Sequence, residues 1–336
     1  MDNYNKCIKD DKPLELALND CLSCSGCVTE DEKQSILFSH LNDVKSLEKN
    51  AVIIISPYSK LNAYNYFNTG ISYSQFEDIL FNFLENFEVI DTSFYLNTIL
   101  ENIRKEFNTR SPLIISDCPG TVKYIQRNGH HLTKYLSEVY SPQEICALIN
   151  DNKTIVSVIP CLDKKMEKVK IDYYLTTKEF IEYLHYNGFT LSDTKCKFTA
   201  TDKFRSNFMN SFSGGYTEYL MNILKNNFTK EENAKGFIVY KSEKYVFYKV
   251  YGLKNILNFI NMTRKKVEFT FAEVFLCDNA CVGGPARVNK EIIKEMSLIN
   301  ELNYKTNILS DNIDFNCKGK TFKEEKIKKI SFNVEW

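Results

Sequence analysis

Residues 154–169 read TIVSVIPCLDKKMEKV. The β-branched and apolar run Thr154–Pro160 is typical of a buried strand. Cys161 follows this strand directly, and the Lys-rich stretch Leu162–Val169 has the character of a helix start. The segment therefore predicts a thiol held at the point where a strand passes into a helix.

The same order of strand, cysteine and helix or loop recurs in two other places. The run Ser111–Ser116 leads to Cys118, and Val267–Leu276 leads to Cys277 and Cys281. The carboxyl ends of parallel strands share one edge of a sheet, where ligands usually bind. Helix amino termini at that edge lower the pKa of a thiol. We therefore expect a buried four-sulfur site made by Cys118, Cys161, Cys277 and Cys281.

Buried cysteines also pack as small hydrophobic residues, and this is the alternative for each of the four. The repeated strand-end context favours the metal site. Cys146 lies among Ile145, Ala147 and Leu148 and is interpreted as a core residue, whereas Cys196 and Cys317 have no ligand-like neighbours.

Short strands alternate with amphipathic helices from residue 51 onward, which predicts an α/β fold with mainly parallel sheets. We expect two α/β lobes with mainly parallel sheets flanked by helices, at residues 49–152 and 153–316. A small ferredoxin-like cysteine segment at 1–48 precedes them, and a tail at 317–336 follows. The expected strands are Ala51–Ser56, Leu113–Ser116, Thr154–Ile159 and Val267–Leu276, and the expected helices include Tyr73–Asn86, Thr92–Asn108, Pro142–Asn150 and Tyr216–Asn227.

Composition excludes several classes of protein. The chain has 336 residues with 43 Lys and Arg and 43 Asp and Glu, so it lacks the positive surplus of a nucleic-acid binder. Its longest apolar runs are far shorter than the ~20 residues that a membrane span needs. The first residues resemble neither a secretory signal nor an import sequence. We expect a cytoplasmic protein that also enters the nucleus, and its 11 cysteines are then reduced rather than disulfide-bonded.

A second cysteine group lies near the amino terminus. Cys21, Cys24 and Cys27 form a C-x2-C-x2-C run in which Gly26 lets the backbone bend. Three thiolates at this spacing favour an iron–sulfur cluster, and Cys7 is the nearest upstream thiol for a fourth ligand. Structural zinc is the alternative metal, and a metal-free segment is the remaining possibility.

These residues resemble the iron-only hydrogenase-like family of cytosolic iron–sulfur assembly factors, which includes a prelamin-A recognition factor. The likeness covers more than 250 residues and rests on motifs in family order. These are Cys7-Ile8-Lys9, Asn19–Thr29, Ile55-Ser56-Pro57-Tyr58-Ser59-Lys60, Ser116-Asp117-Cys118-Pro119-Gly120, Ser141-Pro142-Gln143, Ile159–Glu167, Ser213-Gly214-Gly215-Tyr216 and Cys277–Gly284.

The resemblance implies two [4Fe-4S] clusters, and a two-lobed α/β fold around the second, buried cluster. The ligands of the first would be Cys7, Cys21, Cys24 and Cys27, and those of the second Cys118, Cys161, Cys277 and Cys281. Lys164 of the P-C-x-x-K-K-x-E motif would lie beside the second, where its charge suits an anionic cluster. The family links an early cluster scaffold to a targeting complex, similar to a WD-repeat protein with its partners, that delivers clusters to apoproteins.

The resemblance to hydrogenases is incomplete at one position. Hydrogenases carry a proton-relaying cysteine immediately before the cubane ligand, and this chain has Asp117 there. We therefore expect an adaptor without enzyme activity. A redox enzyme, either a hydrogenase or an electron-transfer protein, is the alternative, and a zinc-stabilised scaffold is a third interpretation.

The chain ends in Asn333-Val334-Glu335-Trp336, and Trp336 is its only tryptophan. Tryptophan is a common interface anchor, and a terminal carboxylate adds a second point of recognition. The end resembles the aliphatic-acidic-Trp tail by which clients and adaptors engage the targeting complex. Glu335 and Trp336 are therefore candidate partner-binding residues, and a tail folded back onto the protein is the alternative.

Overall fold

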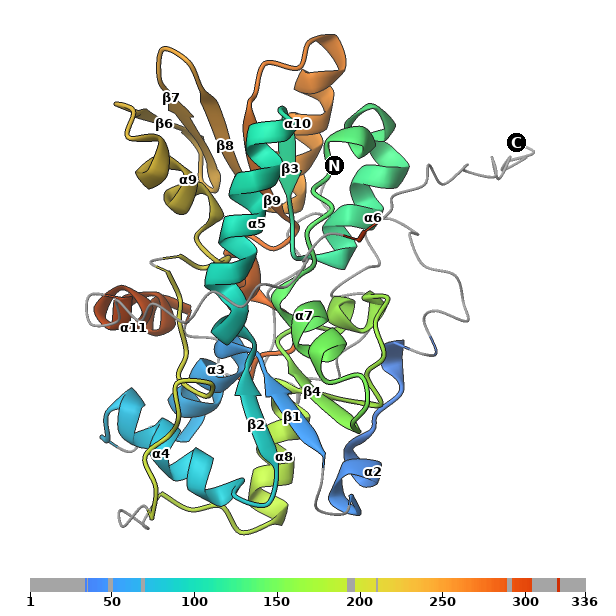
Figure 1. Cartoon of the computed structure of the whole chain (residues 1–336), viewed down its shortest axis with the longest axis vertical. Coiled ribbons are helices and arrows are strands. Elements are labelled where there is room, and N and C mark those ends of the chain that lie inside the picture. The colour runs from blue at the N-terminus through green and yellow to red at the C-terminus, as the bar shows by residue number, and fades with distance from the viewer. Residues whose placement is uncertain are drawn as a thin grey trace, which may run out of the picture.

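The computed structural model describes residues 34, 36–47, 51–67, 70–191, 197–209, 211–288, 292–303 and 319–320. Two β-sheets form its centre, one in the lower half of Figure 1 and one in the upper half, with helices around both. This is the α/β architecture with helix-flanked sheets that the sequence predicts.

The lower sheet, sheet A, is entirely parallel. Its strands follow the order β2-β1-β4-β5 and comprise β1 (Val52–Ile55), β2 (Glu88–Asp91), β4 (Ile155–Ile159) and β5 (Tyr173–Thr176). Every residue of β1 and β4 is buried, as expected for central parallel strands covered on both faces.

The upper sheet, sheet B, is mixed. Its order is β3-β9-β8-β7-β6, with β3 (Leu113–Ile115), β6 (Thr229–Ala234), β7 (Phe237–Lys241), β8 (Val246–Tyr251) and β9 (Phe271–Phe275). Strands β3, β9 and β8 pair in parallel, while β8-β7 and β7-β6 are antiparallel. Strand β6 lies at the edge and is exposed throughout, and its Lys and Glu side chains protect it from further pairing.

The helices begin where the sequence provides caps. Ser72, Ser141 and Thr176 each form a capping box with a Gln or Glu three residues later. The α-helices are α2 (Leu41–Lys45), α3 (Pro57–Phe67), α4 (Tyr73–Phe83), α5 (Leu96–Thr109), α6 (Pro119–Asn128), α7 (Pro142–Ile149), α8 (Thr177–Tyr186), α9 (Tyr216–Leu224), α10 (Leu253–Lys265) and α11 (Ile292–Asn303). The 3₁₀ helices are η2 (Thr92–Tyr95), η3 (His130–Tyr135), η4 (Leu162–Met166) and η5 (Ala280–Gly283).

The two sheets share a hydrophobic core. One cluster of buried side chains contains Val52 and Ile54 of sheet A together with Phe247 and Phe271 of sheet B. Helix α5 bridges them, and in Figure 1 it extends from the lower sheet up into the upper half of the molecule. Separate clusters cover the other face of sheet A, against α3, α4 and α8, and the other face of sheet B, against α6 and α10.

The chain passes between the sheets more than once. Strand β3 belongs to sheet B although it precedes β4 and β5, which pair with sheet A. The expected lobe boundary between residues 152 and 153 therefore assigns β1 and β4 to different lobes, although they are neighbouring strands of sheet A. Within the described part of the chain, no helix has the length and apolar character to cross a bilayer.

Candidate functional site

The predicted cysteines of the second site lie where strands of both sheets end. Cys118 follows β3 and is the N-cap of α6, where its Sγ accepts a hydrogen bond from Thr121 N at 3.4 Å. Cys161 follows β4 and is the N-cap of η4. Cys277 follows β9, and Cys281 lies in η5. The cysteines follow the strand ends of two different sheets, whereas the sequence pattern predicted that all of them lie at one edge of a single sheet.

Backbone contacts hold these segments against one another. Leu276 N, next to Cys277, donates to Thr121 Oγ1 in the first turn after Cys118 at 2.9 Å. Ala286 N, beyond η5, donates to the oxygen of Pro160 at 3.2 Å, immediately before Cys161. Gly284 packs so closely on Pro160 that a side chain there would collide with its carbonyl oxygen. The structure thus makes neighbours of the segments that carry all four cysteines.

Burial keeps the thiols of Cys118 and Cys281 neutral in the absence of a metal, so the lowered thiol pKa expected from helix amino termini is wrong for these two residues. Burial, followed by the nearby Asp163, raises the pKa of Cys118 to about 11. Burial also raises the pKa of Cys281 to about 12, and Cys118 and Asp117 add to this effect against the opposing charge of Lys164. Cys118 and Cys281 are therefore close enough to influence each other. Binding of a cluster to these thiols must release protons.

The donor set suits iron–sulfur chemistry better than a single ion. Among the described residues, no group of three or more His, Cys, Asp or Glu side chains is placed to hold one metal ion. A cubane cluster distributes four thiolates over four different iron atoms, so its ligands lie farther apart than those of one ion. Four soft sulfur donors from neighbouring segments fit such a cluster.

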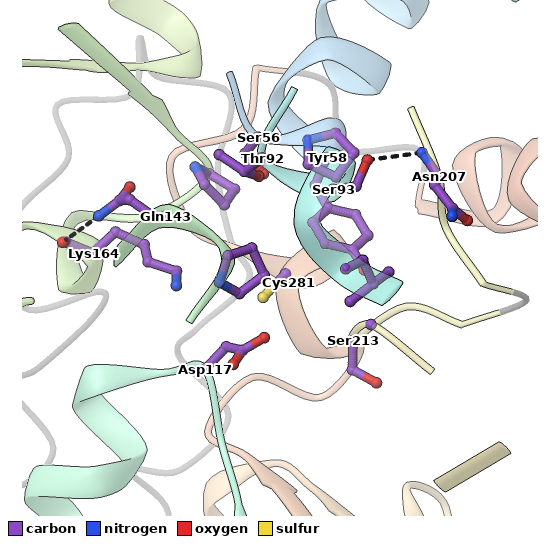
Figure 2. Close-up of a pocket in the computed structure, with 15 residues that line it drawn as sticks. Ser56, Tyr58, Thr92, Ser93, Asp117, Gln143, Lys164, Asn207, Ser213 and Cys281 are labelled. Atoms are coloured by element: carbon purple, nitrogen blue, oxygen red, sulfur yellow. Dashed lines mark hydrogen bonds between the residues drawn. The ribbon is translucent and has the colours of Figure 1, made fainter. Parts of the chain in front are cut away.

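A cavity of about 50 Å³, enough for a few water molecules, adjoins Cys281. Figure 2 shows Lys164, Asp117 and Cys281 on one side of it and Tyr58, Ser93 and Asn207 on the other. Its walls come from the ends of β1, β3 and β4, from η2, α7 and η5, and from the loop before α9. The lining residues are Ser56, Pro57, Tyr58, Thr92, Ser93, Leu96, Asp117, Pro142, Gln143, Pro160, Lys164, Asn207, Ser213, Gly214 and Cys281.

Lys164 is held by a buried network. Its Nζ lies 2.6 Å from Glu167 Oε1, and the same carboxylate accepts bonds from Ser141 Oγ and Gln143 Nε2, both at 2.7 Å. Burial alone would lower the pKa of Lys164, but Glu167, Asp117 and Cys281 together raise it. Lys164 therefore stays cationic beside Cys281. This network thus joins two motifs that are distant in the sequence, Ser141–Gln143 and the Lys164–Glu167 pair.

Asp117 lines the cavity on the same side as Ser213 of the loop before α9, as Figure 2 shows. Burial raises its pKa, against the opposing effects of Lys164 and of the hydrogen bond that Tyr216 Oη donates to its carboxylate. Gly214 and Gly215 have φ angles of +110° and +74°, and the ring of Tyr216 packs on Gly214. A side chain at Gly214 would collide with this ring, and one at Gly215 would collide with Met209. The Ser213–Tyr216 motif thus positions Tyr216 on Asp117.

A buried ion cluster supports the far wall. Lys60 Nζ lies 2.9 Å from Glu77 Oε1 and 2.8 Å from Asp91 Oδ2. Asp91 in turn accepts bonds from both the amide and the hydroxyl of Ser93. Ser93 Oγ accepts the amide of Asn207 at 2.8 Å, the bond drawn in Figure 2. Lys60, the last residue of the Ser56–Lys60 motif, therefore helps to position the cavity residues Ser93 and Asn207 through Asp91.

Asp163 is a site residue that the sequence did not reveal. It occupies an unspecified position of the P-C-x-x-K-K-x-E pattern, two residues after Cys161. Its Oδ2 lies 3.8 Å from Cys118 Sγ, and burial raises its pKa to about 7. Ser93 and Asn207 were also missed, because neither belongs to a motif and only folding brings them to the cavity.

The other predicted site residues fall outside the described part of the chain. They are Cys7, Cys21, Cys24 and Cys27 of the first cluster and Glu335 and Trp336 of the tail. The bystander cysteines Cys196 and Cys317 also lie outside it. Cys146 is fully buried in the core around α5 and α7, which confirms its interpretation as a core residue.

Comparison with known proteins matches residues 49–285 to a family described as iron only hydrogenase large subunit, C-terminal domain. The cytosolic Fe-S cluster assembly factor NAR1 of Encephalitozoon cuniculi is 32% identical, with 98% of this chain and 97% of that protein aligned. The cytosolic Fe-S cluster assembly factor narfl of Xenopus tropicalis is 27% identical over 82% of this chain and 72% of its own.

A solved structure shares the fold. The apo FeFe-hydrogenase HydA1 of Chlamydomonas reinhardtii superposes with a TM-score of 0.59 at 15% identity, covering 78% of this chain and 88% of the hydrogenase. At this identity the likeness establishes the arrangement of sheets and helices and leaves the chemistry open.

Proposed function

Because this chain belongs to the iron-only hydrogenase-like family, among relatives named as cytosolic Fe-S cluster assembly factors, we propose that it is itself an assembly factor for cytosolic iron–sulfur proteins. The observation that supports this proposal is that backbone contacts bring together the segments that carry the four cysteines, next to the cationic Lys164 and a cavity that Cys281 lines. That combination of soft ligands and a buried positive charge suits an anionic cluster.

Cys118, Cys161, Cys277 and Cys281 would hold one [4Fe-4S] cluster. Such a cluster supplies one-electron redox chemistry and can also be handed on as cargo. The chain's own contribution is to orient the thiols at the starts of α6 and η4, and to balance charge through Lys164. Cys7, Cys21, Cys24 and Cys27 would hold a second [4Fe-4S] cluster, a proposal that rests on their spacing and the family resemblance.

We further propose that the protein links an early cluster scaffold to the targeting complex in the cytoplasm, and in the nucleus as a second compartment. Glu335 and Trp336 are the proposed contact to the WD-repeat protein of that complex. Removing Trp336 should weaken capture of the purified complex, while Trp336→Phe should retain part of it. Equal capture by all three proteins would remove the tail from the proposal.

Enzyme activity is not part of the proposal, because Asp117 stands where a hydrogenase has its proton-relaying cysteine and is engaged by Tyr216. The hydrogenase-like fold makes a redox enzyme the alternative function. A hydrogen-evolution assay with reduced dye under anaerobic conditions separates the two functions. The assembly role predicts no sustained turnover, and sustained turnover would overturn it.

Metal content tests the cluster site itself. Anaerobically purified wild-type protein should contain iron and acid-labile sulfide, and Cys161→Ala should lose the share that belongs to the second site. Cys146→Ala is the matched control because this thiol is equally buried and lies in the core. Zinc without sulfide in the wild type would favour the scaffold interpretation, and equal losses in both variants would show that Cys161 is not a ligand.

A further inference from the structure

Asp163 has an unusual environment for a carboxylate. The residue lies in η4 and is only 5% exposed. Its Oδ1 is buried without a hydrogen-bond partner among the described residues, and its Oδ2 faces Cys118 Sγ at 3.8 Å. A buried carboxylate with one oxygen left unpaired is destabilising, so the protein must gain a partner for this oxygen in another state or tolerate the penalty.

The neighbouring cation does not fill this role. Lys164 directs its Nζ to Glu167 at 2.6 Å, on the cavity side of η4. Asp163 instead packs against the first turn of α6, where a methyl group at Gly120 would overlap Oδ2 and approach Cys118 Sγ. The absence of a side chain at position 120 therefore leaves room for a carboxylate beside the thiol, next to a helix amino terminus that favours negative charge.

The spacing of the two side chains lets either of them reach one metal atom. Asp163 Oδ2 lies 3.8 Å from Cys118 Sγ. Each iron atom of a cubane binds three sulfides and one protein ligand, so the carboxylate can bind this iron atom only when the thiolate has left it. Carboxylate oxygens are established ligands for iron in proteins.

We propose that Asp163 is an alternative oxygen ligand to the iron atom that Cys118 holds in the second cluster, and that it takes the place of the thiolate when the iron–sulfur bond to Cys118 breaks. This inference rests on the proposed function, because it requires a cluster at the four cysteines. One iron atom then differs from the other three, with a carboxylate ligand available at the site where the thiolate binds. Because oxygen binds cluster iron less strongly than thiolate does, this corner is where the cluster exchanges most readily.

The experiment asks whether Asp163 can hold the cluster when Cys118 is removed. It uses full-length protein carrying Cys24→Ala, so that the second site dominates the iron signal, and compares Cys118→Ala with Cys118→Ala/Asp163→Asn. Asparagine keeps the shape of the side chain and removes its charge. We expect Cys118→Ala to retain most of the iron and sulfide of its parent, and the double variant to lose both.

Two further variants complete the design. Cys161→Ala should lose the cluster even with Asp163 present, since the carboxylate faces Cys118. Asp163→Asn alone should slow the loss of iron to a ferrous chelator by about tenfold, because the Cys118 thiolate then has no competing ligand. Circular dichroism of each protein establishes that it is folded, and electron–nuclear double resonance of reduced Cys118→Ala should show a non-sulfur ligand on the cluster.

The outcomes separate the two proposals. If the parent protein contains iron and sulfide but Cys118→Ala and the double variant lose them equally, the role of Asp163 is wrong and the assembly function stands. An unchanged chelation rate in Asp163→Asn would likewise overturn the role of Asp163 alone. If the parent protein contains neither iron nor sulfide at this site, both proposals fail together.

Discussion

Replacing Lys60 with methionine should destabilise the protein strongly and open the cavity wall. Lys60 is fully buried, and its ammonium group contacts Glu77 and Asp91 while lying 4.1 Å from the centre of the Phe204 ring. Methionine keeps the length and apolar body of the side chain but leaves two buried carboxylates without this cation. Asp91 is the more vulnerable, because Glu77 keeps an ion pair with Arg205 at 3.2 Å.

The magnitude follows from the cost of an unpaired buried charge. Breaking a buried pair by removing one partner costs about 3–5 kcal/mol. Asp91 keeps hydrogen bonds from Ser93 and Ser206, which places the expected loss near the lower figure of about 3 kcal/mol. Burial already raises the pKa of Asp91 against the opposing charge of Lys60, so loss of Lys60 raises it further. A protein loses stability as the pH rises through the pKa of a buried carboxyl whose pKa is raised by folding. Lys60→Met should therefore be less destabilised at pH 5 than at pH 7.5.

Urea unfolding followed by circular dichroism measures the effect at both pH values. Lys153→Met is the control, because Lys153 pairs with Glu88 on the surface and both side chains are 40% exposed. Such pairs contribute less than about 1 kcal/mol. If Lys60→Met unfolds at the same urea concentration as the control, the buried cluster does not stabilise the fold as argued. A pH-independent loss would contradict the role assigned to Asp91.

Three smaller predictions concern single residues. Cys146→Ala should cost about 1 kcal/mol of unfolding free energy by leaving a small core cavity, with iron and sulfide content unchanged; a loss of iron would place this thiol at the metal. Burial, assisted by Lys165, lowers the pKa of His40, so the stability that it contributes is complete above pH 6.5 and is lost as the pH falls through the folded pKa. Wild-type protein should therefore lose stability relative to His40→Gln between pH 7 and pH 5, and parallel pH profiles would refute this. Glu273→Gln should cost about 1–3 kcal/mol, because Glu273 is fully buried and accepts bonds from Ser213 and Tyr251; thermal unfolding at wild-type temperature would contradict it.

Most of the structure that could be predicted from the sequence lies in apolar segments. The strands expected from Ala51, Leu113 and Thr154 all form, because uninterrupted β-branched runs suit the centre of a covered sheet. Strand β6 has the sequence TKEENA, is wholly exposed and carries no apolar pattern, so only its pairing with β7 reveals it. The stretch expected to start a helix at Leu162 forms a 3₁₀ helix that ends at Met166, before Glu167 turns to bond Ser141.

The position of the candidate cysteines at strand ends was predictable from the sequence, and the setting of the site was less so. Repeated strand-end cysteines indicated Cys118, Cys161 and Cys277 without any knowledge of how the strands are ordered. These strand ends belong to two different sheets because β3 joins sheet B. This is a long-range pairing that no local pattern encodes. The environment of Asp163 likewise depends on α6 packing against η4, so its unpaired oxygen emerges only from the folded chain.

An anomalous difference map collected at the iron absorption edge, from anaerobically grown crystals of the full chain, tests the central claim most directly. The account predicts a compact iron peak enclosed by the Sγ atoms of Cys118, Cys161, Cys277 and Cys281, between the two sheets and beside Lys164. Iron elsewhere in this half of the molecule, or thiols that remain free around a metal-free cavity in iron-replete protein, would contradict it.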